Sequence, residues 1–566
     1  MGIGTARQLE RIECSIGMLE EAQPIFEHSD NVCHAGVLFL LPSLISQGLM
    51  KGKDIYGKLK NGYYGLVSTL LVLAYMSRLV GIKTPEALKL CKPGEFGKII
   101  GLDRVPEVKC LRGKIEEIVE QNKAKEFSSI LAQGWISDEQ SAYFYIDGHV
   151  RVYHGDKAKL TKKYVSREKL CLAGTTEFWV NNELGLPYLV VTGELNEKLK
   201  NVIIDQIIPE LLKDTASIIN EQELQAEPKK PRFTIIFDRE AYEPAFFKQI
   251  WENHRIAVIT YRKGVKDLWN ESEFTGCSTK VIGKEITMLL AERRVELSGM
   301  QMREIRKLSD SGHQTSIITT NETISTEIVG GKMFSRWSQE NFFKYMLQDY
   351  EIDKAIEYGI ESIEFNKMVV NPFYKDITYK LKKLKEKQNR VKARLMQVLE
   401  KNLDASIEEF KQSVQKQAEA RETIKAYQDD INEKLMERKQ IPYYLALKDM
   451  PEENRYNKLK TESKLFINTI KMIAYRAETA VGNIIAPFYA RGEDEMRMLV
   501  KDIIKSDADL IPDYTNNTLT VVLHTLSTPR ANRAAEELCD ILNATETVYP
   551  ATELKLIYKT IGFYST

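Results

Sequence analysis

Apolar residues recur at two different spacings along this chain, and the spacing changes after the first quarter of the sequence. Before that point it is helical, as in residues 107–121, where Leu111, Ile115 and Ile118 fall on one helical face. After it come short stretches rich in aromatic and β-branched residues, a composition typical of strands. The pattern predicts a helical region over residues 1–135, followed by a region built on a β-sheet.

Three short helices are expected near the end of the first region, at 84–88, 95–100 and 107–121. Thr84 and Pro85 make a good helix start, because threonine favours the N-cap and proline the first helical position. With a glycine-containing turn, such helices are compatible with a helix-turn-helix, whose last helix presents basic residues to DNA. Those residues are Lys109, Arg112 and Lys114. An ordinary helical packing unit explains the same pattern equally well.

Five strands and two helices are expected in the second region. The strands are 142–155, 176–182, 187–193, 232–238 and 255–262, and the helices are 202–212 and 243–253. Three antiparallel strands followed by α/β alternation are the order of an RNase H-like core. Strand-like stretches at 279–292, 301–308 and 314–321 then predict a β-rich insertion, and 334–350 is expected to be one helix.

A long helix of coiled-coil type is predicted between Pro372 and Pro442, where the sequence has neither glycine nor proline. Seven residues step by alternating four and three, as the a and d positions of a heptad do. They are Ile377, Leu381, Leu384, Gln388, Val391, Leu395 and Val398. This seam must be buried, either against a second copy of the chain or against a later helix of the same chain.

The expected fold class is therefore multidomain α+β. The predicted parts are a helical N-terminal domain (1–135), an RNase H-like core (136–263 and 333–371), a β-rich insertion (264–332), a long helix or coiled coil (372–442) and a small α/β region (443–566).

Charge is balanced over the whole chain, with 80 lysines and arginines and 80 aspartates and glutamates, so net charge gives no indication of nucleic acid. Basic residues nevertheless cluster. Residues 157–169 contain six against one glutamate, and residues 374–394 contain nine against two acidic residues. Neutralisation of DNA phosphates explains both clusters, and so does a solvated surface.

The seven cysteines are widely spread and contain no CxxC pair, which argues against disulfides or a structural zinc site. The apolar runs at 36–50 and 66–77 are too short to span a membrane, and the N-terminus does not resemble a signal peptide. We therefore expect a cytoplasmic protein, associated with the bacterial nucleoid if it binds DNA.

Two aspartates stand at the ends of apolar strands: Asp147 after 143–146 and Asp238 after 233–237. A carboxylate at the end of a buried strand is costly unless a cation, a helix N-terminus or an arginine compensates it. In an RNase H-like sheet these two strands are neighbours, so the two carboxylates would converge at one end of the sheet.

A third carboxylate is expected from Glu340 on the helix at 334–350. Phe334, Trp337 and Met346 are predicted to face the core, which leaves Glu340 near the sheet. Four other glutamates compete for this role: Glu240, Glu292, Glu304 and Glu327. His149 shares the side of the strand that carries Asp147 and is interpreted as a structural residue.

Three motifs carry a family resemblance: YIDGH at 145–149, FDRE at 237–240 and SRWSQENFFKY at 335–345. They resemble the three acidic motifs of bacterial insertion-sequence DDE transposases, in the branch with a β-rich insertion before the glutamate. The third motif of that family pairs a basic-aromatic dipeptide with a glutamate and a later phenylalanine, matched here by Arg336, Trp337, Glu340 and Phe343. The tyrosine that usually precedes the arginine is missing, and Phe334 stands nearest to it.

This resemblance implies that Asp147, Asp238 and Glu340 hold Mg²⁺ or Mn²⁺, which prefer oxygen ligands. Water would cut the transposon ends, and the freed 3′-hydroxyl would then attack target DNA. The expected partners are double-stranded DNA and, in the DNA complex, a second copy of the chain. The expected DNA contacts are Arg336, Lys344, Lys162, Lys163, Arg112, Lys382 and Lys383.

Two other functions remain open on the sequence. An RNase H-like nuclease without strand transfer would share the same three carboxylates. A catalytically inactive DNA-binding coiled-coil protein would explain the basic helix.

Overall fold

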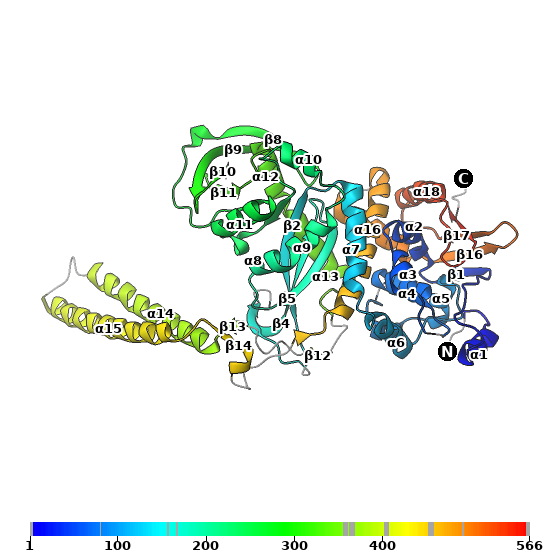
Figure 1. Cartoon of the computed structure of the whole chain (residues 1–566), viewed down its shortest axis with the longest axis horizontal. Coiled ribbons are helices and arrows are strands. Elements are labelled where there is room, and N and C mark those ends of the chain that lie inside the picture. Colours follow the sequence, from blue (N-terminus) through cyan, green and yellow to red (C-terminus); the bar gives the residue numbers. More distant parts are fainter. Residues whose placement is uncertain are drawn as a thin grey trace. The chain divides into compact units, whose positions relative to one another are not determined.

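The computed structural model describes residues 4–60, 62–79, 81–155, 158–165, 168–354, 360–361, 368–400, 407–450, 458–489 and 492–561 (Figure 1). The chain divides into two compact units, each described by itself below. The first unit is made of Met1–His154, Thr161–Tyr358 and Lys460–Thr566, and the second of Gly155–Leu160 and Gly359–Leu459.

A ten-stranded sheet forms the centre of the first unit. Its order is β3-β4-β2-β6-β7-β11-β10-β9-β8, with β5 also paired to β4. The strands are β2 (Tyr143–Val152), β3 (Lys162–Val165), β4 (Leu170–Asn181), β5 (Pro187–Glu194), β6 (Thr234–Phe237), β7 (Ala257–Tyr261), β8 (Thr275–Val281), β9 (Lys284–Leu297), β10 (Met300–Leu308) and β11 (Gln314–Thr319). The predicted order is confirmed, because β2, β4 and β5 are antiparallel neighbours and β6 and β7 follow parallel to β2.

The two faces of this sheet differ in chemistry because side chains alternate along each strand. One face carries Phe144 and Ile146 of β2 and, on β6, Phe237, which packs against Phe247 of α11 (Pro244–His254). The opposite face carries Tyr145, whose hydroxyl donates to a backbone carbonyl of α12 (Thr326–Phe334) at 2.9 Å. Asp147 and His149 lie on that second face, beneath the helices that follow the sheet.

The predicted β-rich insertion is not a separate layer, because β8 to β11 continue the central sheet beyond β7. The single strand expected at 279–292 is two strands, joined by a turn in which Ile282 and Gly283 both have positive φ (49° and 73°). Glycine favours that conformation and isoleucine does not, so the local pattern concealed the turn. Helix α12 packs closely on this hairpin at Gly331, where a Cβ would lie 2.7 Å from the carbonyl oxygen of Lys280.

The N-terminal part of the first unit is helical, as expected. Its longer helices are α1 (Gln8–Ser15), α4 (Leu66–Arg78), α5 (Pro93–Ile99), α6 (Val108–Val119) and α7 (Ala124–Glu139). The helix start expected at Thr84 differs, since Pro85–Leu90 is a 3₁₀ helix and the Thr84 side chain makes no capping hydrogen bond.

Helix α16 (Glu462–Tyr489) connects the parts of the first unit, because it packs against both α4 and α7 and against α17 (Glu493–Lys505) and α18 (Pro529–Ala544) (Figure 1). A second sheet has the order β1-β16-β17-β18 and joins both ends of the described chain. Its strands are β1 (Ser29–Val32), β16 (Ala508–Asp513), β17 (Thr518–Leu523) and β18 (Lys555–Thr560).

The second unit contains a helical hairpin of α14 (Pro372–Glu400) and α15 (Ile407–Gln440), seen side by side in Figure 1. Ile377 and Leu381 of the predicted seam are buried against Ile431 of α15. The structure therefore covers the first part of the seam with a later helix of the same chain. This unit also contains two short strand pairs, β12 (Ile360–Glu361) with β15 (Lys458–Leu459) and β13 (Met368–Val370) with β14 (Tyr444–Ala446), and a 3₁₀ helix at Leu447–Asp449.

Within the described part of the chain, no helix combines the length and apolarity that a membrane crossing requires.

Candidate active site

Asp147 and Asp238 lie on neighbouring strands at the same end of the central sheet. Strands β2 and β6 run parallel, with Ile146 opposite Phe237. One residue further along each chain comes an aspartate, so the two carboxylates are adjacent and on the same face of the sheet. Folding therefore brings together the first two carboxylates that the sequence singled out.

Asp147 is held by a cation and by its own backbone. The guanidinium Nη1 of Arg336 lies 3.3 Å from Asp147 Oδ2, and the backbone N–H of Gly148 donates to Oδ1 at 2.9 Å. Burial nevertheless raises the pKa of Asp147 to about 6, against the lowering effect of Arg336, and the negative charges of Asp238 and Glu240 add to the rise. Burial is the largest cause of the rise, and Arg336 and the Gly148 N–H offset it only in part.

Glu340 is exposed in the first turn of α13 (Trp337–Tyr350). Its position relative to the aspartates is indicated by Tyr261, the last residue of β7. Burial raises the pKa of Tyr261, Arg336 lowers it, and Asp238 and Glu340 raise it further. All of these groups thus lie within electrostatic range of one phenol.

The expectation that Trp337 faces the core is wrong, because its side chain is 61% exposed. The helix predicted at 334–350 begins only at Trp337, because α12 ends at Phe334 and residues 335–336 separate the two helices. Ser338 and Gln339 are buried in place of Trp337, while Phe334 stays partly buried at the end of α12.

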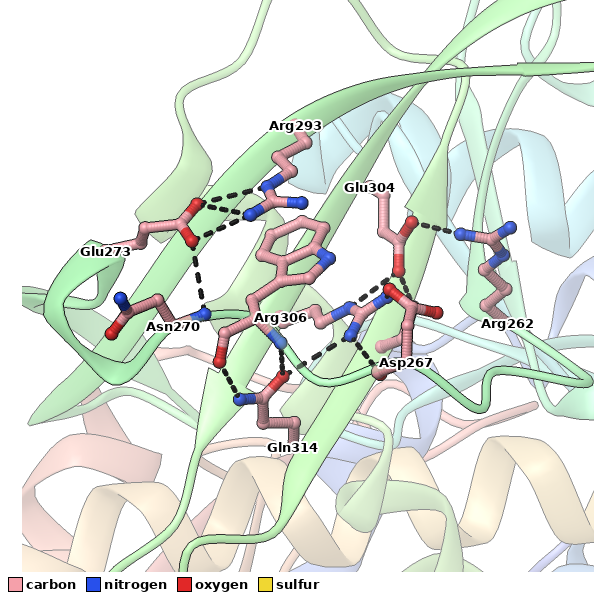
Figure 2. A network of polar contacts seen from close by, with 10 residues as sticks. Arg262, Asp267, Asn270, Glu273, Arg293, Glu304, Arg306 and Gln314 are labelled. Atoms are coloured by element: carbon pink, nitrogen blue, oxygen red, sulfur yellow. Dashed lines mark hydrogen bonds and ion pairs between the residues drawn. The ribbon is translucent and has the colours of Figure 1, made fainter.

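Two of the four competing glutamates, Glu304 and Glu292, are engaged in ion pairs with arginines, and Figure 2 shows those of Glu304. Glu304 accepts from Arg306 Nε at 2.8 Å and Ser316 Oγ at 2.7 Å, and its second oxygen pairs with Arg262. Glu292 accepts two bonds from Arg303, at 2.8 and 2.7 Å. These carboxylates have their charge compensated by arginine and are poor candidates for a metal ligand. Glu327 lies in the first turn of α12, and only Glu240 is close enough to influence Asp147.

A divalent cation suits the two aspartates chemically, since carboxylate oxygens are the donors that Mg²⁺ and Mn²⁺ prefer. The guanidinium of Arg336 already supplies positive charge at this position. Among the residues that the structure describes, however, no three acidic, histidine or cysteine side chains are close enough together to hold a metal ion. In this conformation the cluster is two aspartates and an arginine, with Glu340 on the adjoining helix.

The predicted DNA contacts fall into two groups. Arg336, Lys344 and Arg112 are paired with carboxylates, with Asp147, Asp494 (2.9 Å) and Glu86 respectively. Lys162 and Lys163 on β3 and Lys382 and Lys383 on α14 are exposed, and Lys383 is 3.2 Å from Glu386. Of the basic segment 157–169, Lys157, Ser166 and Arg167 lie outside the described residues.

His149 is buried, as its interpretation as a structural residue requires, and it makes two specific contacts. Its Nε2 donates to Asp353 Oδ1 at 2.6 Å, and its ring stacks on Phe343 with centroids 5.3 Å apart. Neither Asp353 nor Tyr261 stands out in the sequence. The only signal for Tyr261 is its place at the end of a strand parallel to the one that precedes Asp238.

Comparison with known proteins identifies the class to which this chain belongs. A family model described as "Transposase protein" matches residues 2–562, and the chain is therefore a member of this transposase family. No curated protein matches. Among solved structures, the cryo-EM structure of the piggyBac transposase synaptic complex with hairpin DNA is similar over 79% of this chain and 76% of that one. Its sequence identity is 9% and its TM-score 0.28, a likeness too low to define a shared fold.

Proposed function

We propose that this transposase cuts and joins DNA with Asp147, Asp238 and Glu340 on an RNase H-like core formed by residues 136–263 and 333–371. The observation that carries the proposal is the register of β2 and β6, which sets Asp147 beside Asp238 at one end of the sheet. Raised pKa values and convergent carboxylates are typical of functional sites. The DDE resemblance of the three motifs supports the same assignment.

The three carboxylates would hold Mg²⁺ or Mn²⁺, and two such ions supply activation of the attacking oxygen and stabilisation of the leaving one. The chain itself would contribute orientation and charge. Arg336, now paired with Asp147, is positioned to move to a DNA phosphate once a divalent cation neutralises that carboxylate. Lys344 stands two turns further along α13 and would extend the same phosphate contact.

Double-stranded DNA is the proposed substrate and partner, with transposon ends and target as its two forms. The exposed lysines of β3 and α14 (Lys162, Lys163, Lys382 and Lys383) would bind its backbone, and Arg112 would do so only after leaving Glu86. Joining needs two DNA ends held together, so we infer a homodimer in the DNA complex.

The test is cleavage and joining of a DNA fragment that carries the element's ends, with Asp147→Asn, Asp238→Asn and Glu340→Gln. Each substitution removes a charge with little change of shape, and each should reduce both reactions by at least about a thousandfold while end binding persists. Glu327→Gln is the matched control for catalysis, since Glu327 is another of the competing glutamates and its replacement leaves no buried arginine without a counter-charge. A Glu340→Gln enzyme with full activity would assign the third carboxylate elsewhere, first to Glu240.

The same assay separates the proposal from its nearest alternative. A nuclease would cut the ends but produce no joined product with target DNA. Cleavage that persists in excess chelator would contradict metal-dependent chemistry altogether.

A further inference from the structure

Strand β2 and helix α13 touch at two points, and Glu340 lies between them. At the first point Arg336, just before α13, contacts Asp147. At the second point Phe343 stacks on His149, with ring planes 24° apart. Arg336, Glu340 and Phe343 are spaced by four and three residues, which sets them along one face of the helix. The two contacts with β2 therefore lie on either side of Glu340 along the chain, one at Arg336 and one at Phe343.

The stack of Phe343 on His149 depends less on what binds at Asp147 than the Arg336 ion pair does. The pair of Arg336 with Asp147 competes with any cation that binds the aspartate. The contact of His149 is not exposed to that competition, since its ring is buried and its hydrogen bond and ring stack are made to Asp353 and Phe343, outside the proposed triad. It can hold the strand and the helix together in either state of the site.

His149 is itself fixed by a well-anchored loop. Asp353, which accepts its hydrogen bond, follows Ile352, whose carbonyl oxygen accepts from the buried Lys464 of α16. The carbonyl of Glu351 accepts from a second buried lysine of α16, Lys471, at 3.3 Å. The loop after α13 is therefore held to α16 by two hydrogen bonds. Through Asp353, this loop sets the orientation of the His149 imidazole.

We propose that His149 is a positioning residue, which through its bond to Asp353 and its stack on Phe343 sets the distance between Asp147 and Glu340 and hence the affinity of their site for a divalent cation. This inference rests on the proposed function. Side chains that contact metal ligands without binding the metal themselves orient those ligands and change the affinity of the site for the metal. His149 would act in this way.

The test measures Mn²⁺ affinity from the electron paramagnetic resonance signal of free Mn²⁺, on the whole chain without DNA. His149→Ala removes both contacts and should weaken Mn²⁺ binding about tenfold, and it should raise the Mg²⁺ midpoint for cleavage by a similar factor. His149→Gln restores an N–H donor near the position of Nε2 and should recover most of the affinity. His154→Ala, which alters an exposed histidine just beyond β2, is the matched control and should bind Mn²⁺ as the wild type does.

Asp353→Ala provides a second variant in case His149→Ala fails to fold, because the Asp353 side chain is one-third exposed (33%). It should also weaken Mn²⁺ binding, with the melting temperature close to that of the wild type. Unchanged Mn²⁺ affinity and Mg²⁺ midpoint in both variants would overturn the positioning role alone. A wild-type chain that binds no Mn²⁺ would overturn it together with the proposed metal-dependent function.

Discussion

Partly and fully buried carboxylates in this protein have two kinds of partner. Asp147 has a guanidinium beside it, whereas Asp214, at the end of α9 (Ile208–Asp214), accepts hydrogen bonds from Ser129 Oγ at 2.6 Å and Gln133 Nε2 at 3.2 Å. Neither neighbour of Asp214 is charged, and burial raises its pKa to about 6. Hydrogen bonds alone therefore do not compensate the lost hydration of the carboxylate.

Asp214 predicts a pH dependence of stability that one substitution removes. The folded-state pKa is raised above the unfolded value, so the native state binds the proton more tightly. The contribution of Asp214 to the free energy of unfolding is fully present below about pH 4 and is lost as the pH rises through about 6. Asp214→Asn is neutral throughout, and it should melt near the wild type at pH 4 but a few degrees higher at pH 7. Scanning calorimetry across that range checks the sign, and parallel curves at all pH values would contradict it.

At the scale of elements, the α14–α15 hairpin shows how one polar residue fits into an apolar seam. Gln388, the polar member of the predicted heptad, donates to Gln428 Oε1 at 3.0 Å and to the carbonyl of Ile424 at 3.2 Å. Its NH₂ group is matched by partners on α15 and its oxygen accepts from Lys392 of α14, while Ile377 and Leu381 pack against the apolar Ile431. Such a pairing fixes the register of the two helices, since a shift would leave the amide buried without partners.

The outer surface of α14 predicts a salt-dependent contact with DNA. Lys382, Lys383 and Lys387 are exposed, and reversing all three to glutamate should weaken binding to duplex DNA. The slope of log affinity against log salt should fall by roughly 0.9 for each phosphate that the variant no longer neutralises. The matched control reverses Lys416, Arg421 and Lys425 on α15, which are also exposed but lie among acidic neighbours. Equal losses of affinity in both triple variants would show a general effect of charge, and unchanged affinity in both would remove the hairpin from DNA binding.

At the scale of the whole molecule, α16 holds distant parts of the sequence together through buried charge. Glu478 accepts from Arg78 of α4 at 2.9 Å and lies 3.8 Å from Arg497 of α17, and all three side chains are at most 5% exposed. The hydroxyl of Tyr350, at the end of α13, donates to the same carboxylate at 2.5 Å. One carboxylate thus links an N-terminal helix, the helix of Glu340 and the C-terminal region.

Glu478→Gln should destabilise the first unit strongly, because Arg78 then remains buried without its counter-charge and Arg497 keeps only its pair with Glu493. Breaking one partner of a buried ion pair typically costs about 3–5 kcal/mol, so the calorimetric transition should move to clearly lower temperature. Glu493→Gln is the matched control: Glu493 also pairs with Arg497, at 3.1 Å, but its side chain is 39% exposed and the loss should be below about 1 kcal/mol. Equal melting temperatures for the two variants would contradict the role assigned to Glu478.

The sequence by itself determined the order and type of the central elements, because strand and helix periodicities are local properties. It indicated β2, β4, β5, β6 and β7, the long helical segment after Pro372, and the two aspartates at strand ends, whose adjacency follows from the parallel pairing of β2 and β6. The sequence pattern was least informative where a residue adopts a backbone conformation that its residue type disfavours. Ile282 in a left-handed turn hid the division of β8 from β9.

Only the tertiary structure decided which residues become partners across long distances in sequence. It pairs Ser29 of β1 with Leu510 of β16, buries Lys464, Lys471 and Glu478 of α16, and leaves Trp337 exposed after the helix break. No periodicity encodes these outcomes, because a buried charge or an exposed tryptophan is set by what the rest of the chain brings beside it. The contact of Arg336 with Asp147, and with it the state of the proposed catalytic site, belongs to this second group.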